Sequence, residues 1–247
     1  AAGKTVFASS FAMFAAGRAF EPIRNAIGYP HLNVKIGATH AGITVGEDGA
    51  THQCLEDIAL MRTIPGMTVI NPADAVEARA AVKAAILQKG PMYLRFGRLA
   101  VPVIYDKDSY RFEIGKGVVM TEGCDVALVA TGIMVNMALE AAKVLEERGI
   151  HARVINIHTI KPIDRELLLR AAGECGAIVT AEEHNVIGGL GSAVAEVVSE
   201  ACPVPVIRLG TEDRFGHSGK VPPLLEMYGL TVQNLVAKAE LAVSLKK

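Results

Sequence analysis

The sequence lacks several features that mark common functional classes. It has no tryptophan, and only 5% of its 247 residues are aromatic, so small aliphatic residues must supply the core. Such a core is usual for parallel sheets that helices cover on both faces. The formal net charge is −1, and no block of like charges suggests a surface for nucleic acid or for an anionic membrane. No apolar run reaches the ~18 residues that a membrane-spanning helix needs.

The cysteines do not form a recognisable metal or disulfide pattern. Cys54, Cys124, Cys175 and Cys202 include no Cys-x-x-Cys pair and no cysteine at zinc-ligand spacing from a histidine. We therefore expect reduced thiols in a cytoplasmic protein, and no metal site on this chain. The sequence also lacks a phosphate-binding Walker motif, a zinc-protease motif and a nucleophile elbow.

Strand-like and helix-like segments alternate along the chain, which predicts an α/β fold with two consecutive parallel-sheet domains. The first domain is expected over residues 1–108 and the second over residues 109–247, with a polar stretch at their junction. Ala1 is not a plausible natural start, so we expect residues upstream of it.

In the first domain, the strand at residues 5–9 is predicted to be buried, and Asn71 is predicted to cap the third helix. The other predicted strands of this domain are 33–37, 67–70 and 92–96, and its helices are about 11–27, 54–62 and 73–88. The predicted strands of the second domain are 125–130, 152–156, 177–181 and 205–208, and its helices are 134–148, 165–172, 193–201 and a segment from about 232.

The most informative stretch is residues 38–53, a long segment between a predicted strand and a predicted helix. A loop this long in a compact domain is usually functional or disordered, and the apolar residues threaded through it argue against disorder. Ligands of parallel sheets bind beyond the carboxyl ends of the strands, where this loop begins. We therefore predict that residues 38–53 are the active-site loop.

Chemically capable side chains gather at this edge of the first sheet. Imidazoles can relay protons, arginines in a rigid turn can grip a phosphate, and aromatic rings can stack on a flat heterocycle. Together they predict a phosphorylated, hydroxyl-rich substrate beside an aromatic cofactor. The residues in question are His40, Asp48 and His52 of the loop, Arg95 and Arg98 of the next turn, and Phe11 and Phe14 of the first.

Each of these residues also has an ordinary structural interpretation. The histidines could be solvated, Asp48 could simply favour a turn, the phenylalanines could belong to the core, and the arginines could be surface charges. The glycine-rich run at residues 188–192 could bind phosphate at a helix start, but close packing of helix on strand is the better explanation. The stretch Glu182-Glu183-His184 could be an interface or the edge of a site.

Several motifs nevertheless resemble one family. Thr39-His40, followed by Gly46-Glu47-Asp48-Gly49-Ala50-Thr51-His52-Gln53, is similar to the active-site loop of transketolases. The chain as a whole resembles the C-terminal subunit of a two-chain transketolase. The similarity continues through residues 7–11, 71–74, 95–98, 159–164 and 188–191.

This resemblance implies a pyrimidine-binding domain followed by a transketolase C-terminal domain, with thiamine diphosphate bound between subunits. The aminopyrimidine ring would stack on Phe11, with Phe14 nearby. His52 would lie close to that ring and the reacting carbonyl, and His40 would act with it in catalysis. Substrate phosphate and hydroxyls would be held by His40, Asp48, Arg98 and Arg95.

Two parts of the family's site do not occur in this sequence. The Gly-Asp-Gly motif that holds the diphosphate and its Mg²⁺ or Ca²⁺ is absent, so the resemblance implies an N-terminal transketolase subunit that carries it. The glutamate that protonates the pyrimidine ring is expected upstream of Ala1. We expect a dimer of heterodimers that transfers a two-carbon ketol unit between sugar phosphates of the pentose phosphate pathway, and an inactive single chain.

Three other interpretations remain open. A 1-deoxyxylulose-5-phosphate synthase has a similar loop and arginine turn, but it lacks a histidine equivalent to His40. The β subunit of a two-oxoacid dehydrogenase is also a separate chain, but it needs no clamp for a sugar phosphate. A non-catalytic regulatory module is the third possibility, because part of the active site is missing.

Overall fold

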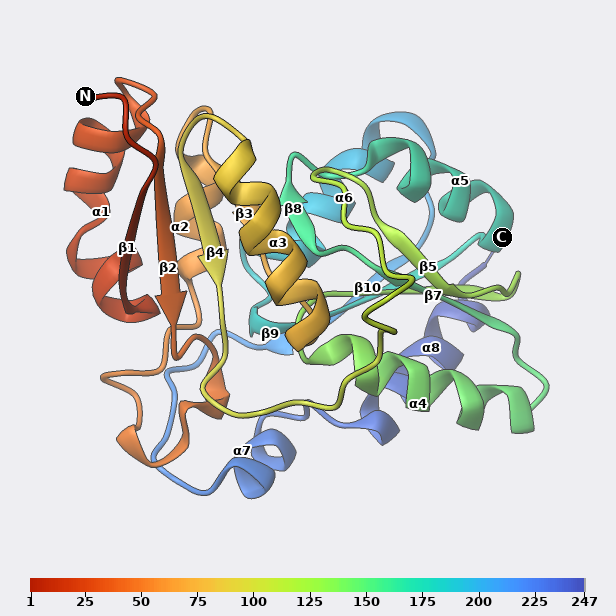
Figure 1. The fold of residues 1–247 in the computed structure, drawn as a ribbon. Coiled ribbons are helices and arrows are strands. Elements are labelled where there is room, and N and C mark those ends of the chain that lie inside the picture. The colour runs from red at the N-terminus through yellow and green to blue at the C-terminus, as the bar shows by residue number, and fades with distance from the viewer. Residues whose placement is uncertain (247) are drawn as a thin grey trace.

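The computed structural model describes residues 1–246 and contains two five-stranded sheets flanked by helices (Figure 1). The first sheet is parallel except at one edge, where its last strand runs antiparallel. In spatial order its strands are β1 (Val6–Phe11), β2 (Val34–Thr39), β4 (Met92–Arg95), β3 (Thr68–Ile70) and β8 (Thr159–Lys161).

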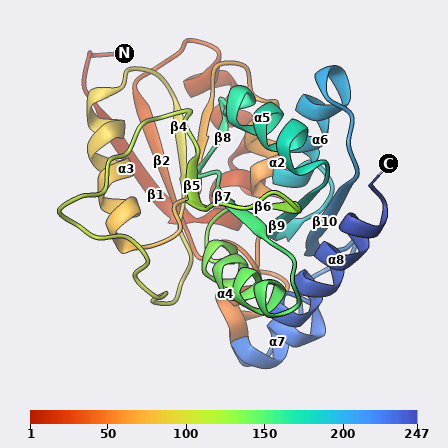
Figure 2. The same ribbon diagram turned by 90° about the vertical axis from the view of Figure 1, so that its right-hand side faces the viewer.

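Helices cover both faces of the first sheet, with α3 on one side and the α1 and α2 segments on the other (Figure 2). The predicted helix at residues 11–27 is divided into two wider π-helical segments around one short α-helical turn. The segments of this half are η1 (Met13–Arg18), α1 (Phe20–Pro22), η2 (Ile23–Gly28), the 3₁₀ helix η3 (Ile43–Asp48), α2 (Asp57–Thr63) and α3 (Ala75–Leu87).

The second sheet also carries one antiparallel edge strand, β5, beside four parallel strands. Helices α4 and α8 pack together on one face, and α5 and α6 on the other (Figures 1 and 2). The strand order is β10 (Val206–Thr211), β9 (Ile178–Asn185), β6 (Val126–Ala130), β7 (Ala152–Asn156) and β5 (Val118–Thr121). The helices are α4 (Met134–Glu147), α5 (Arg165–Cys175), α6 (Leu190–Ala201), α7 (Val221–Met227) and α8 (Val232–Ser244).

Two local predictions in the first half are wrong. The strand predicted to be buried is β1, which forms an exposed sheet edge with Val6 and Phe7 more than 40% accessible. Asn71 does not cap α3; the cap is Asp74, whose carboxylate accepts a hydrogen bond from the Glu77 amide (2.8 Å). The same aspartate accepts bonds from two amides of the 97–117 connection, so its position is fixed by tertiary contacts that local sequence does not reveal.

Both halves of the sequence contribute to the first sheet and to its core. Strand β8 comes from the second half of the sequence but pairs with β3 of the first sheet. The Asn71 amide donates to the His158 carbonyl (2.8 Å), and the Thr131 hydroxyl donates to the Asn71 carbonyl (3.2 Å). One cluster of buried apolar side chains is continuous from Ala12 of the first half to Val198 of the second. The second half therefore forms part of the support for the first sheet.

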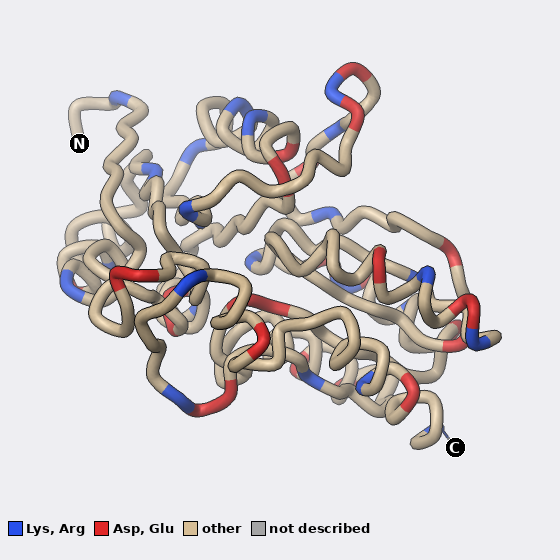
Figure 3. Tube along the Cα trace, turned by 90° about the horizontal axis from the view of Figure 1, so that it is seen from below, with Lys and Arg blue, Asp and Glu red and all other residues tan. Residues whose placement is uncertain are grey.

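The surface of the described chain carries both signs of charge. Figure 3 shows basic and acidic positions interspersed along the trace. Across residues 1–246, every helix is too short or too polar to cross a membrane.

Candidate active site

The loop at residues 38–53 is held in part by its own backbone and by one buried glutamine. Gly42 and Gly49 have φ values of +83° and +72°, a region that glycine enters without strain. The Gly42 amide donates to the Cys54 carbonyl (2.9 Å), which closes the loop at its base. The Gln53 side-chain amide donates to the carbonyls of Ile43 (3.1 Å) and Gly46 (3.3 Å). The loop therefore folds back on itself around η3.

Four of the predicted site residues form one cluster of rings beside this loop. The His40 ring stacks on the Phe11 ring, with centroids 3.9 Å apart and planes 8° apart. The Phe11 and Phe14 rings are nearly parallel (13°), with centroids 6.0 Å apart. The His52 ring meets Phe14 edge-on at 5.4 Å. Both imidazoles also contact a neighbouring threonine hydroxyl through Nδ1.

Asp48 and Arg98 lie at the open rim of the same loop. Asp48 ends η3 and is exposed to solvent. The Arg98 guanidinium donates to the Val45 carbonyl and lies 3.4 Å from a Glu47 carboxylate oxygen. Its side chain is 36% exposed, so much of its hydrogen-bonding capacity faces solvent. Both side chains are therefore accessible to a polar ligand at the rim of this loop.

Arg95 does not lie at this rim, contrary to the prediction that it contacts substrate. Its side chain is 3% exposed and bonds to a carboxylate oxygen of Asp57 (2.9 Å) and to the carbonyl of Glu183 (2.9 Å). Burial alone would lower the pKa of Arg95, but the nearby carboxylates of Asp57 and Glu183 raise it, so the guanidinium stays charged. Arg95 is therefore a buried link between the two halves of the chain.

The glycine-rich run at residues 188–192 does not offer its helix start to a phosphate, because a carboxylate of the same chain occupies it. Glu182 accepts hydrogen bonds from the Leu190 (2.6 Å) and Gly191 (2.8 Å) amides at the start of α6. A Cβ atom at Gly189 would lie 2.0 Å from a Glu182 carboxylate oxygen. Close packing therefore explains the glycines, in agreement with the structural interpretation of this run.

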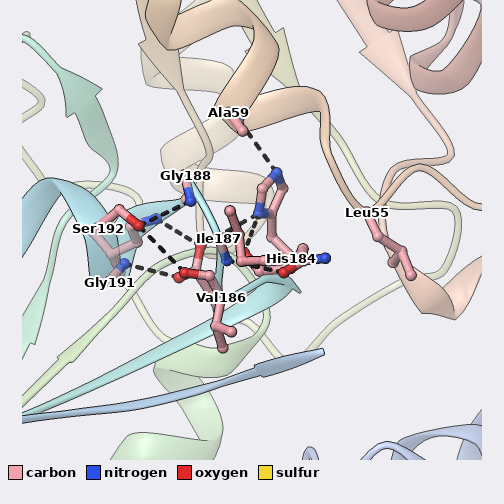
Figure 4. Close-up of polar contacts among 12 residues, drawn as sticks. Leu55, Ala59, His184, Val186, Ile187, Gly188, Gly191 and Ser192 are labelled. Atoms are coloured by element: carbon pink, nitrogen blue, oxygen red, sulfur yellow. Dashed lines mark hydrogen bonds and ion pairs between the residues drawn. The ribbon is translucent and has the colours of Figure 1, made fainter. Parts of the chain in front are cut away.

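His184 ties the same region to the first domain (Figure 4). The Ala59 amide of α2 donates to His184 Nε2 (3.3 Å), and His184 Nδ1 donates to the Asn185 carbonyl (2.7 Å). Burial lowers the pKa of His184 to about 4, which keeps the ring neutral near pH 7. Glu183 and His184 thus contact the first half of the chain, whereas Glu182 bonds within the second half.

One segment of the site was not identified from the sequence. Residues 212–220 of the second half pack over the active-site loop, and the Gln53 side chain donates to the His217 carbonyl (2.9 Å). Phe215, which is 91% exposed, helps to line a cavity of about 660 Å³ together with Phe14 and Thr51. Gly216 lies so close to Gln53 that an added Cβ atom would collide with it, and only the structure reveals this contact.

The residues present fit one part of thiamine diphosphate. Phe14 lines the cavity, the nearly parallel Phe11 ring lies beside it, and the His52 ring meets the Phe14 ring edge-on. This arrangement of rings is suitable for binding a flat heteroaromatic ring. Among residues 1–246 no group of three or more histidine, cysteine or acidic side chains is placed to hold a metal ion. The rings on this chain thus fit the pyrimidine part of the cofactor.

Comparison with known families identifies both halves of the chain. Residues 1–103 match the model of the transketolase pyrimidine-binding domain, and residues 115–235 match that of the transketolase C-terminal domain. The chain belongs to the transketolase family. It corresponds to the C-terminal subunit of transketolases that are divided between two chains.

Individual relatives support this assignment. The 6-deoxy-6-sulfo-D-fructose transketolase subunit of Clostridium sp. (strain MSTE9) is 45% identical over 97% of this chain and 74% of its own length. An apulose-4-phosphate transketolase subunit of Phocaeicola vulgatus is 40% identical over 96% of this chain and 76% of its own length. A solved split gene transketolase, an inactive beta4 tetramer, has 56% identity and a TM-score of 0.91 over 99% of this chain and 78% of that chain.

A second activity occurs among the relatives. The 1-deoxy-D-xylulose-5-phosphate synthase 1 of Geobacter sulfurreducens is 39% identical over 93% of this chain, which spans 36% of that protein. The family assignment therefore does not by itself fix the substrate.

Proposed function

We propose that this chain supplies the pyrimidine-binding half of the active site of a two-chain transketolase. The complete enzyme would transfer a two-carbon ketol unit from a ketose phosphate to an aldose phosphate. The observation that carries the proposal is the ring cluster of Phe11, Phe14, His40 and His52 beside an open cavity. Flat-ring binding and proton transfer are then available at one place.

In this proposal each residue of the chain has a separate task. Phe11 and Phe14 hold the aminopyrimidine ring. His52 and His40 exchange protons with the substrate's carbonyl and hydroxyl oxygens, since an imidazole can both donate and accept. Arg98 binds the substrate phosphate through its guanidinium, and Asp48 accepts hydrogen bonds from sugar hydroxyls. When bound, thiamine diphosphate supplies the carbanion-stabilising group that protein side chains lack.

The proposal requires an N-terminal transketolase subunit. That partner would carry the Gly-Asp-Gly motif, the diphosphate site and the Mg²⁺ or Ca²⁺ ion, since this sequence lacks the motif. Two of the relatives are themselves named as transketolase subunits, which supports a two-chain arrangement. We expect two such pairs to associate into a dimer of heterodimers.

The proposal is tested by adding the companion chain. The two purified chains, mixed with thiamine diphosphate and magnesium, should convert xylulose 5-phosphate and ribose 5-phosphate, while this chain alone should not. Transfer by the single chain at the rate of the mixture would overturn the two-chain arrangement. Calorimetry on the mixture should detect uptake of thiamine diphosphate, and its absence would instead support a regulatory module.

A synthase that condenses pyruvate with an aldehyde is the second candidate, because a 1-deoxy-D-xylulose-5-phosphate synthase is among the relatives. The same mixture should therefore be assayed with pyruvate and glyceraldehyde 3-phosphate. Turnover of pyruvate in preference to xylulose 5-phosphate would favour the synthase. Turnover of pyruvate without a phosphorylated acceptor would favour a two-oxoacid dehydrogenase subunit.

A further inference from the structure

A glutamate of the second domain reaches into the active-site loop of the first. Glu183 lies near the end of β9 and is 3% exposed. Its carboxylate accepts a hydrogen bond of 2.6 Å from the Thr44 amide, which belongs to the first turn of η3. These two residues are 139 positions apart in the sequence. The start of η3 is thus held by a carboxyl oxygen that its own domain does not supply.

The backbone of the loop is shaped to admit this side chain. A Cβ atom at Gly42 would lie 2.2 Å from the Glu183 carboxylate, so any larger residue there would collide with it. Gly42 also has a φ of +83°, which other residues adopt only with strain. Gly42 therefore leaves space for the Glu183 carboxyl group, and the Thr44 amide, which has no partner within the helix, donates a hydrogen bond to it.

The backbone carbonyl of Glu183 also has a buried hydrogen-bond partner. Its carbonyl accepts a bond from Arg95 (2.9 Å), and Arg95 is in turn paired with the buried Asp57 (2.9 Å). Burial raises the pKa of the Glu183 carboxyl, while the Arg95 charge and the Thr44 amide oppose that rise. The Arg95 bond fixes the backbone at residue 183, and burial and the Thr44 amide restrict the side chain, so the carboxyl group can define the position of what it binds.

The position of Glu183 along the loop gives this contact a functional meaning. His40 precedes the Glu183 contact by a few residues, and η3 leads from it to Asp48 and then His52. The far end of the loop is held by a second contact from the same domain, between Gln53 and the His217 carbonyl. The Thr44 and Gln53 ends of the segment that carries Asp48 and His52 are therefore fixed by the C-terminal domain, and His40 lies just before this segment.

We infer that Glu183 is a positioning residue, through which the C-terminal domain sets the geometry of the loop that carries His40, Asp48 and His52. This inference rests on the proposed function for the role of those three side chains. Small displacements of reacting groups cost rate steeply, about a hundredfold for 1 Å. The C-terminal domain thus contributes to catalysis without touching the substrate.

Three substitutions separate this role from simple support of the fold. Glu183→Leu fills the same space but removes the acceptor, and Glu183→Gln keeps an acceptor oxygen for the Thr44 amide. Glu182→Leu is the matched control, because Glu182 is the neighbouring buried glutamate and bonds to α6 instead of the loop. If Glu183→Leu does not fold, Glu183→Asp keeps the charge near Arg95 but shortens the side chain by one methylene.

The first readout is hydrogen exchange of residues 41–48 in the reconstituted two-chain complex. Exchange there should be about 10–100-fold faster in Glu183→Leu or Glu183→Asp, because loss of this buried hydrogen bond exposes the amides to local opening. It should stay within about threefold of wild type in Glu182→Leu and Glu183→Gln. Equal exchange in all variants, or the same increase in Glu182→Leu as in Glu183→Leu, would overturn the inference.

The second readout is kinetic. In Glu183→Leu we expect kcat/KM for ketol transfer to fall about 10–100-fold, with thiamine diphosphate affinity changed by less than about threefold, and Glu183→Gln should restore most of the rate. A fall in cofactor affinity alone would contradict the inference. If the wild-type complex shows no ketol transfer but the loop exchange still responds to Glu183, the proposed function fails while the positioning role stands.

Discussion

The two sheets of this protein have similar architecture but differ in where they place polar chemistry. The first sheet has an exposed edge strand, and its loops carry half-exposed rings at Phe11 and His40 together with an open Arg98. In the second sheet, β6 and β7 are buried throughout, and the polar residues at the end of β9 are buried as well. Accessible polar groups can meet a ligand, whereas buried ones must be satisfied by the protein itself.

The two domains therefore differ in the polar groups they offer: those of the first domain are partly exposed, and those of the second are buried, chiefly in contacts between the halves. Arg95 and Arg98 show it most directly, because they are three positions apart in the same strand-to-turn segment. Arg95 points into the contact with the second domain and is fully paired, while Arg98 stays at the rim of the loop. One arginine stabilises the join between the domains, and the other is partly exposed at the loop, where it bonds to Val45 and lies near Glu47.

Removing Arg95 should produce the largest change in stability. Arg95→Met leaves the buried carboxylate of Asp57 without its charged partner, so we expect the free energy of unfolding to fall by about 3–5 kcal/mol. Chemical denaturation of the purified chain measures it. Adding Asp57→Asn, which removes the unpaired charge, should recover part of the loss. A change below about 1 kcal/mol in Arg95→Met would show that the join does not depend on this pair.

The contact between the sheets should also respond to acid through His158. Burial lowers the pKa of His158 from 6.5 to about 4, so the unfolded chain takes up a proton at a higher pH than the folded chain does. The stability linked to this residue is complete above pH 6.5 and is lost as the pH falls toward 4.

Between pH 7 and pH 4.5, the wild-type chain should therefore lose about 2–3 kcal/mol more than His158→Asn, which keeps an acceptor beside Thr159. Urea denaturation at both pH values gives the comparison. His151, which is exposed on the second domain, provides the control substitution His151→Asn, whose acid response should match wild type. Parallel losses in wild type and His158→Asn would contradict a buried, neutral His158.

Arg98 should affect turnover and leave stability nearly unchanged. Arg98→Ala is expected to lower kcat/KM for phosphorylated substrates about 10–100-fold, because it removes a charge-assisted contact to phosphate. The free energy of unfolding should stay within about 0.5 kcal/mol of wild type. Arg98→Lys keeps the charge without the bidentate geometry and should recover only part of the rate. Equal losses for phosphorylated and unphosphorylated substrates would show that Arg98 has another role.

Most regular elements could be predicted from the sequence, because their apolar runs and glycine or proline boundaries are local signals. The sequence predicts the strand at residues 152–156 with the bounds that the structure gives it. The four elements that it does not predict, η3, β5, β8 and α7, are short, and two of them, β5 and β8, are edge strands that depend on partners far along the chain. The exposure of β1 is not predicted because composition cannot distinguish an edge strand from a central one.

The sequence by itself determined the α/β class and the transketolase family, since motifs and periodicity depend on neighbouring positions, and it predicts the active-site loop. Only the tertiary structure decided which of two arginines is buried, and it alone revealed that Glu183 reaches Thr44. Contacts of this kind join residues more than a hundred positions apart. Their formation depends on how the two sheets pack, and no local pattern in the chain encodes that packing.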